Sequence, residues 1–119
     1  GFDAATIIIS GTKAKEAGMV LSEFTLFGIG GKELAEENAV ETAKVLNVIK
    51  PDFVRVHATG IKLSSEMWNY VKNKELTLQS EEEIVSEQKI MLELLADDMD
   101  CIYMNEHIVN PDEKTLVFY

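Results

Sequence analysis

The sequence predicts an α/β protein with parallel strands, and three observations support this. Residues 20–27 and 52–58 alternate in the manner of strands. The segment between them has the apolar spacing of a helix, and a further helix precedes a third candidate strand at 100–104. Strands joined by helix-length connections run parallel, and parallel sheets need helices and more strands around them. We therefore expect part of a larger β/α barrel or of an open α/β sheet. A small independent α/β domain is the alternative.

Local signals place the helices. Asp3 is a candidate N-cap for a first helix that ends near Gly18. A second helix is predicted over residues 33–49, and Pro51 follows its end. Its stripe of apolar positions consists of Ala35, Ala39, Ala43, Leu46 and Ile49.

The second half of the chain has a similar pattern. A short helix is predicted over residues 65–71, and Ser80 with Glu83 forms a capping box before a longer amphipathic helix. The buried face of that helix is predicted to carry Ile84, Gln88, Met91 and Leu95. The tail after Pro111 is a candidate for one more strand.

Composition excludes several classes of protein. The net charge of −10 argues against a nucleic-acid surface, which needs clustered lysine and arginine. Apolar runs such as residues 7–9 are too short to cross a bilayer, and no basic segment followed by an apolar core suggests a secretory signal. We therefore expect a cytoplasmic protein.

The metal-binding residue types are scarce. Cys101 is the single cysteine, so neither a disulfide framework nor a site built from several thiolates of this chain is expected. The two histidines, His57 and His107, lack the spacing of metal ligands. No metal site is predicted within the chain.

The candidate functional site lies where the predicted strands end. In parallel α/β folds, function collects at the carboxyl ends of the strands, here residues 28–31, 57–60 and 105–107. The first of these segments is rich in glycine, which lets backbone amides approach a phosphate or the nucleoside part of a flat cofactor. The sequence has no G-x-x-x-x-G-K-[ST] motif, and Glu33 disfavours a pyrophosphate at the following helix.

Strand alternation also suggests which side chains line a cavity. We expect Val54 and Val56 to pack against helices, so that Arg55 and His57 point to the interior. On the preceding strand the more polar residues are expected to join them. The predicted lining is thus Glu23, Thr25, Arg55 and His57. Glu23 and Arg55 would then form either a structural ion pair or a pair that orients a ligand, and His57 is either a wall residue or a base.

Several motifs resemble a known family. The pattern S-E-F-T-L-F-G-I-G-G-K-E is followed by N-A-x-E-T-A-x-V-L-N-x-I-x-P-D-F-V-R-V, then by L-S-S-E-M-W-N-Y-V-K-N-K-E-L-T-L and E-H-I-V-N. In this order and spacing, over residues 14–110, they resemble the late portion of radical S-adenosylmethionine (radical SAM) proteins. The resemblance is strongest to the iron–sulfur oxidoreductases related to oxygen-independent coproporphyrinogen oxidase.

The resemblance implies a fold and a cofactor site. The fold would be a partial (βα)6 TIM-like barrel, with its last two strands in residues 1–61 and a C-terminal extension in 62–119. The turn after the fifth barrel strand would contact the adenosine and methionine parts of SAM, and the end of the sixth would hold the adenine. The residues in these positions are Gly28, Ile29, Gly30, Gly31, His57, Ala58 and Thr59. The cavity wall would include Glu23, Thr25, Arg55 and His107.

The sequence also departs from the family pattern. Phe24 stands where the family's G-x-I-x-G-x-x-E begins, and the acidic residue is displaced to Glu33. The C-x-x-x-C-x-x-C motif that binds the 4Fe-4S cluster is absent. The resemblance therefore implies a C-terminal fragment of a radical SAM oxidoreductase, inactive alone, whose partner is the missing N-terminal half of the barrel and whose substrate is unknown.

That reading has structural consequences and alternatives. The strand at residues 20–27 should have an unpaired edge, and the fragment is expected to self-associate. One alternative is a small nucleotide-binding α/β module that uses residues 28–31. The other is a non-catalytic interaction domain.

Overall fold

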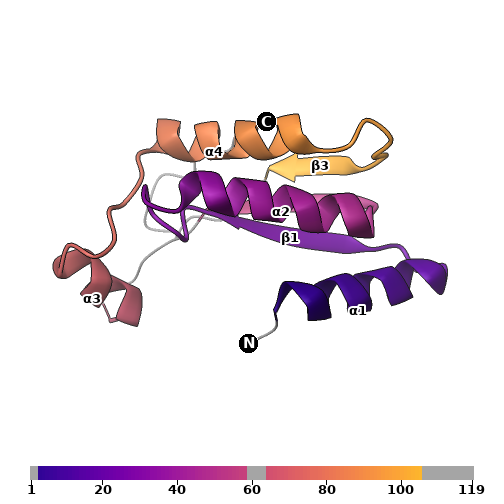
Figure 1. Cartoon of the computed structure of the whole chain (residues 1–119), viewed down its shortest axis with the longest axis horizontal. Helices are drawn as coiled ribbons and strands as arrows, with labels where there is room; N and C mark the ends of the chain where they lie inside the picture. The colour runs from indigo at the N-terminus through magenta and orange to yellow at the C-terminus, as the bar shows by residue number, and fades with distance from the viewer. Residues whose placement is uncertain (1–2, 59–63, 106–119) are drawn as a thin grey trace.

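The computed structural model describes residues 3–58 and 64–105 of the 119-residue chain. Figure 1 shows the order of the elements. Their bounds are α1 Ala4–Glu16, β1 Ser22–Phe27, α2 Ala35–Ile49, β2 Phe53–Ala58, α3 Glu66–Lys72, α4 Glu81–Leu94 and β3 Ile102–Asn105. Each helix and strand predicted within these residues is present, with ends shifted by a few positions. The candidate strand after Pro111 lies outside the described residues.

The helix starts follow the predicted caps. Asp3 accepts a hydrogen bond from the Thr6 amide at 2.8 Å and begins α1. Ser80 and Glu83 form the reciprocal capping box of α4. Both signals are local in sequence, and local hydrogen bonds satisfy amides that the first turn of a helix leaves unpaired.

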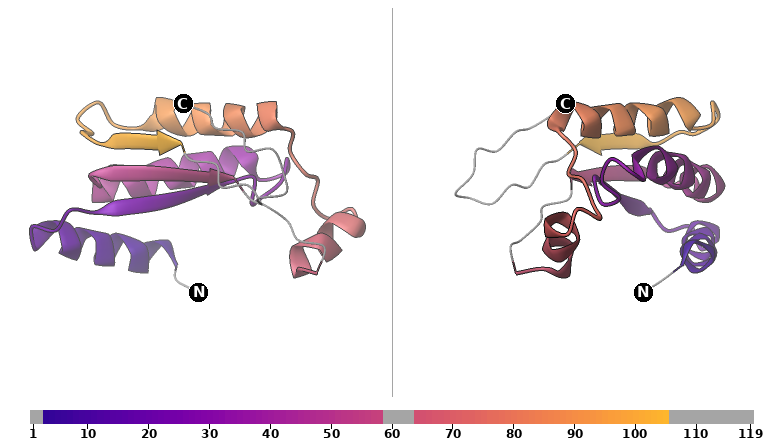
Figure 2. Two further views of the ribbon diagram at one scale, coloured as in Figure 1. Left: turned by 180° about the vertical axis from the view of Figure 1, so that it is seen from behind. Right: turned by 60° about the vertical axis from the view of Figure 1, so that its left-hand side comes forward.

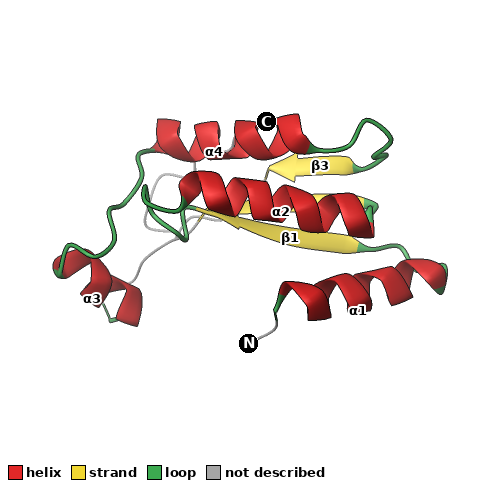
Figure 3. Cartoon of the chain, in the orientation of Figure 1, coloured by secondary structure: helices red, strands yellow, loops and turns green. Residues whose placement is uncertain are grey.

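The three strands form one parallel sheet in the order β1-β2-β3, as the helix-length connections predicted. Figure 3 distinguishes helices, strands and loops by colour. The α/β assignment with parallel strands is therefore confirmed. Within the described residues β1 pairs with β2 alone, so its other edge is free, as expected. Asn38 Nδ2 donates to the Leu26 carbonyl at 3.0 Å and caps one backbone group near the end of β1.

One face of the sheet packs against helices. Helices α2 and α4 contact each other and β1, whereas in the view from behind β1 and β2 lie in front of α2 (Figure 2, left). The core between the sheet and these helices consists of Phe27, Ala39, Ala43, Leu46, Val54, Val56 and Met91. Burial confirms the predicted stripe of α2 from Ala39 to Ile49, with Ala35 half-buried, and the predicted inward position of Met91 on α4.

The strand register corrects one prediction about faces. Phe24 is the ladder partner of Arg55, and Thr25 is the partner of Val56. Because partners share a face, Glu23 and Thr25 lie on the helix-covered face with Val54, opposite Arg55 and His57. The prediction that these four residues line one interior was therefore wrong. Phe27, which has the same strand parity as Thr25, is fully buried, and its burial decides the orientation of β1.

Asp52 joins the ends of three elements. Its carboxylate accepts from the Leu21 amide at 2.8 Å and from Lys15 Nζ at 2.9 Å. The end of α1, the approach to β1 and the approach to β2 are thereby held together. The Leu21 amide and, next, Lys15 hold the pKa of Asp52 below its usual range.

The lowered pKa of Asp52 predicts a pH dependence of stability. The folded state binds the proton less tightly than the unfolded chain, whose aspartate pKa is about 3.9. The stabilisation is therefore complete above that value and is lost as the pH falls through the lower folded pKa. We expect Asp52→Asn to be less stable than wild type at pH 7, with the difference shrinking between about pH 5 and pH 2. Urea unfolding at each pH measures this difference.

The matched control is Asp97→Asn, at an exposed aspartate just after α4. It should change stability little at any of these pH values. A difference between Asp52→Asn and wild type that stayed constant on acidification would contradict the assigned role of the Asp52 carboxylate.

Candidate functional site

The carboxyl ends of β1 and β2 lie side by side, because Phe27 is the ladder partner of Ala58. Residues 28–31, here called the glycine turn, follow β1 at this end of the sheet. His57 and Ala58 end β2 beside it. Thr59 and His107, also predicted as site residues, lie outside the described residues. The structure thus brings together the described members of the predicted cofactor set.

The glycine turn is closed against the segment that leads into α4. Gly31 has φ 62°, and a Cβ on it would lie 2.6 Å from the Thr77 carbonyl oxygen. The Lys32 amide donates to that same carbonyl at 2.9 Å. Because Gly31 has no side chain, its backbone can lie close to the backbone of Thr77.

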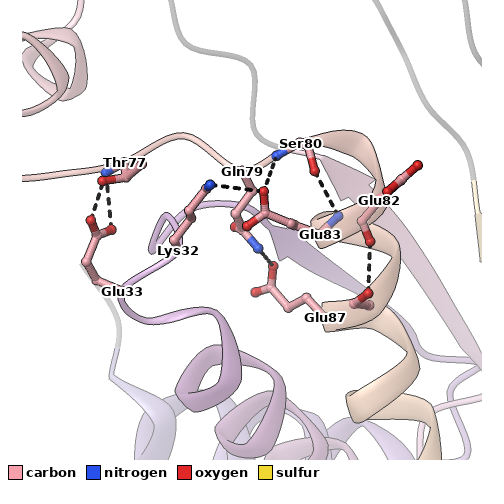
Figure 4. Close-up of polar contacts among 9 residues, drawn as sticks. Lys32, Glu33, Thr77, Gln79, Ser80, Glu82, Glu83 and Glu87 are labelled. Atoms are coloured by element: carbon pink, nitrogen blue, oxygen red, sulfur yellow. Dashed lines mark hydrogen bonds and ion pairs between the residues drawn. The ribbon is translucent and has the colours of Figure 1, made fainter.

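Charged side chains hold the two segments together on the outside (Figure 4). Both carboxylate oxygens of Glu33 accept from the Thr77 amide at 3.1 Å, and hydrogen bonding by Thr77 holds the pKa of Glu33 below its usual range. Lys32 Nζ lies 3.2 Å from the Glu83 carboxylate. The Glu33 carboxylate thus forms a structural hydrogen bond to the Thr77 amide beside the glycine turn.

Beneath the turn lies a buried carboxylate. The side chain of Glu87 on α4 accepts hydrogen bonds from the Gly28 amide at 3.0 Å, Asn38 Nδ2 at 2.7 Å and Gln79 Nε2 at 3.2 Å. Figure 4 shows Gln79 pointing toward it. Glu87 is only 1% exposed, and within residues 3–58 and 64–105 its partners are all neutral donors. A carboxylate buried in this way depends on hydrogen bonds for its stability.

The two central residues of the glycine turn, Ile29 and Gly30, differ from Gly28 and Gly31 in their hydrogen bonding. Among the described residues, no acceptor is present for the backbone amides of Ile29 and Gly30. Ile29 is 44% exposed and Gly30 is half-buried, and both follow the carboxyl end of β1. Two successive amides of this kind can donate to an acceptor atom of a ligand.

The face of the sheet opposite α2 and α4 carries a group of three neighbouring side chains. The Arg55 guanidinium lies 5.9 Å from the centre of the Phe24 ring, and the His57 ring lies 5.2 Å from it. Arg55 Nε also donates to Ser22 Oγ at 3.2 Å. Because Glu23 points to the other face, the predicted Glu23–Arg55 ion pair was wrong, and Phe24 is the neighbour of Arg55 instead.

A groove of about 540 Å³ runs beside the free edge of β1 and reaches the glycine turn. Glu23 and Thr25 line it together with Ile29 and residues of α2. Burial raises the pKa of Glu23. These two predicted wall residues therefore face the groove at the edge of the sheet, and their role toward a ligand stays a prediction.

Three members of the buried cluster were missed from the sequence: Asn38, Gln79 and Glu87. One signal was available for Glu87. It lies three residues after Ile84 and four before Met91, so it occupies the apolar stripe of α4. An acidic residue in such a stripe needs partners, but the sequence does not show that the partners come from the glycine turn and α2.

Residues 3–58 and 64–105 meet neither the requirements of a metal site nor those of a membrane-spanning helix. Within the described part of the chain, no group of three histidine, cysteine or acidic residues could hold a metal ion. Cys101 is half-buried, and burial raises its pKa above the usual range for a thiol. No helix in those same ranges has the length and apolar character needed to cross a bilayer.

The geometry defines the class as an α/β protein with a parallel sheet and a glycine turn at the carboxyl end of its edge strand. Comparisons with family models, with curated proteins and with solved structures found no match.

Proposed function

We propose that this chain is the C-terminal β/α portion of a radical SAM oxidoreductase and that its glycine turn contacts S-adenosylmethionine. The observation that carries the proposal is that the successive amides of Ile29 and Gly30, at the carboxyl end of β1, have no acceptor among the described residues. This is the position at which parallel α/β folds bind their ligands. The order of motifs along the chain supports the same family.

The described residues fit the cofactor in chemical terms. Backbone amides of Ile29 and Gly30 would donate to acceptor atoms of the nucleoside or of the methionine carboxylate. His57 and Ala58, at the end of β2, would border the adenine. Glu33 would repel a pyrophosphate at the start of α2, but SAM carries no phosphate, and the Glu33 carboxylate is turned to the Thr77 amide.

The cluster would be held elsewhere in the intact protein, because this chain has one cysteine and the motif needs three. When bound, a 4Fe-4S cluster supplies the electron for reductive cleavage of SAM. The residues described here would bind and orient the cofactor and form one part of the cavity wall.

Exposed apolar side chains on the sheet face opposite α2 and α4 support membership of a larger barrel. Parallel sheets are normally covered on both faces. Here Phe24 is 65% exposed on the face opposite the helices, and Ile102, the partner of Phe53, is 59% exposed on the same face. The free edge of β1 and the groove beside it would be covered by an additional strand.

SAM binding to the 119-residue chain tests the proposal. We expect a titration followed by ¹⁵N NMR to move the amide signals of Ile29, Gly30 and Ala58, with a dissociation constant of about 1 mM, which corresponds to about 4 kcal/mol. Weak affinity is expected because only one side of the cavity is present.

Parallel titrations with NAD and FMN are the controls. Shifts of the same amides by these ligands, and not by SAM, would favour the nucleotide-binding module and reject the radical SAM assignment. Binding of none of the three, together with concentration-dependent association through the free edge of β1, would favour the interaction domain.

A further inference from the structure

We infer that Glu87 is a positioning residue for the cofactor site: its buried carboxylate on α4 sets the direction of the Ile29 and Gly30 amides. The inference rests on the proposed function, because it assigns these amides to SAM. It extends that function by making α4, in the C-terminal part of the chain, a component of the site.

The contacts of Glu87 fix the glycine turn from below. One carboxylate oxygen, Oε2, accepts from the Gly28 amide at 3.0 Å and from Gln79 Nε2 at 3.2 Å. The other, Oε1, accepts from Asn38 Nδ2 at 2.7 Å. Gly28 directly precedes Ile29 and has φ 83°, so the bond to its amide constrains the backbone where the turn leaves the strand.

Asn38 extends the same constraint to the strand. Its amide group donates both to Glu87 and to the Leu26 carbonyl. The Glu87 carboxylate is thereby linked to both neighbours of Phe27: to Gly28 directly and to Leu26 through Asn38. A displacement of Glu87 would therefore disturb the hydrogen bonds at Gly28 and, through Asn38, at Leu26.

The chemistry of the cluster requires a group that accepts on both oxygens. An ionised carboxylate is such a group, whereas a glutamine has one acceptor oxygen and one donor nitrogen. In Glu87→Gln at least one of the three contacts must be lost, although the size of the side chain hardly changes. A role in packing alone would be met by an apolar side chain such as that of Met91, one turn further along α4.

Gln79 provides a second observation. Its Nε2 points to Glu87, and its Oε1 is buried with no hydrogen-bond partner among the described residues. That oxygen lies against Gly28, 3.7 Å from the position a Cβ would take. An unpaired buried acceptor is unfavourable. In this cluster both carboxylate oxygens of Glu87 accept hydrogen bonds, whereas the amide oxygen of Gln79 accepts none from the described residues.

Glu87→Gln in the 119-residue chain tests the inference. We expect the amide signals of residues 28–31 to move and SAM to bind about tenfold more weakly. Hydrogen exchange of the two bonded amides of the turn, those of Gly28 and Gly31, should become about tenfold faster. Glu93→Gln, at an exposed position on the same helix, is the matched control and should change none of these. Urea unfolding of each variant measures stability separately.

A double variant distinguishes positioning from stability. Combining Glu87→Gln with Asn38→Asp exchanges donor and acceptor across the 2.7 Å contact, and the amide oxygen of the new side chain on α4 stays available to the Gly28 amide. We expect the double variant to recover SAM affinity to within about threefold of wild type, although the bond from residue 38 to the Leu26 carbonyl is lost and stability stays reduced. The double variant therefore also tests the positioning role if Glu87→Gln alone folds poorly.

The outcomes separate the two proposals. Absence of SAM binding by the wild-type chain would reject the proposed function. Turn signals and hydrogen exchange that are unchanged in Glu87→Gln would reject the positioning role, whether or not SAM binds. A loss of SAM affinity that follows the loss of stability in all variants, with no recovery in the double variant, would also reject it.

Discussion

Replacing Phe27 with alanine should lower the free energy of unfolding by about 3–5 kcal/mol, the range for deleting a buried phenylalanine. Phe27 is fully buried between β1 and the helices α2 and α4, in contact with the rest of the core. Its removal would leave a cavity that the surrounding elements cannot fill without shifting. Urea denaturation followed by circular dichroism measures the effect.

Phe24→Ala is the matched control, because the same residue type lies on the same strand but on the opposite face. Phe24 is 65% exposed, and its ring contacts are with Arg55 and His57. We expect a loss of about 1 kcal/mol or less. A larger loss for Phe24→Ala than for Phe27→Ala would show that the two faces of β1 had been assigned the wrong way round.

Gly31→Ala is expected to cost about 2–5 kcal/mol. Alanine in the left-handed region costs about 1–2 kcal/mol. At Gly31 its Cβ would also meet the Thr77 carbonyl oxygen at 2.6 Å and Leu76 Cδ1 at 2.7 Å. The Thr77 carbonyl cannot move away easily, because it accepts the bond from Lys32. Crowding of this kind adds about 1–3 kcal/mol.

Gly18 provides the comparison that isolates the crowding. It has φ 81°, and a Cβ there would meet nothing within 4 Å. Gly18→Ala should therefore cost only the conformational term of about 1–2 kcal/mol. Chemical denaturation of both variants gives the difference, and equal losses would contradict the close approach between the glycine turn and residue 77.

The elements of the fold could be predicted because their signals are local. Asp3 bonds to an amide three residues away, and Ser80 and Glu83 cap each other across one turn. The apolar spacing of α2 and α4 indicated which faces would be buried, and the helix-length connections required parallel strands. Each of these inferences uses residues within one element or the length between two.

The orientation of β1 could not be predicted from polarity alone. Glu23 and Thr25 form the more polar side of the strand, and on that ground they were predicted to line a cavity together with Arg55 and His57. The buried side was decided at the other end, by Phe27, while Phe24 and Leu26 remain 65% and 40% exposed. Side chains in a strand alternate between two faces, so the burial of one residue fixes the face of all the others. In β1 the burial of Phe27 therefore places Glu23 and Thr25 on the helix-covered face, although both are polar.

The buried cluster depends on tertiary contacts that no local pattern contains. Glu87 meets Gly28 across 59 positions of the chain and Asn38 across 49. The glycine turn was identified by its composition, but its support from α4 emerges only when α2 and α4 pack together. For this reason the sequence indicated the tip of the candidate site but not the residues beneath it.

The arrangement of the sheet also bears on the order of folding. Thirty-one positions separate Ser22 from its ladder partner Phe53, and forty-nine separate Phe53 from Ile102. Loop closure alone favours the first pairing by only about 0.4 kcal/mol. Helix α2 lies within that shorter loop and contacts β1, whereas α4 lies within the longer loop and contacts both α2 and β1. Because the glycine turn needs Glu87 from α4, we expect it to take its final shape after β1 and β2 have paired.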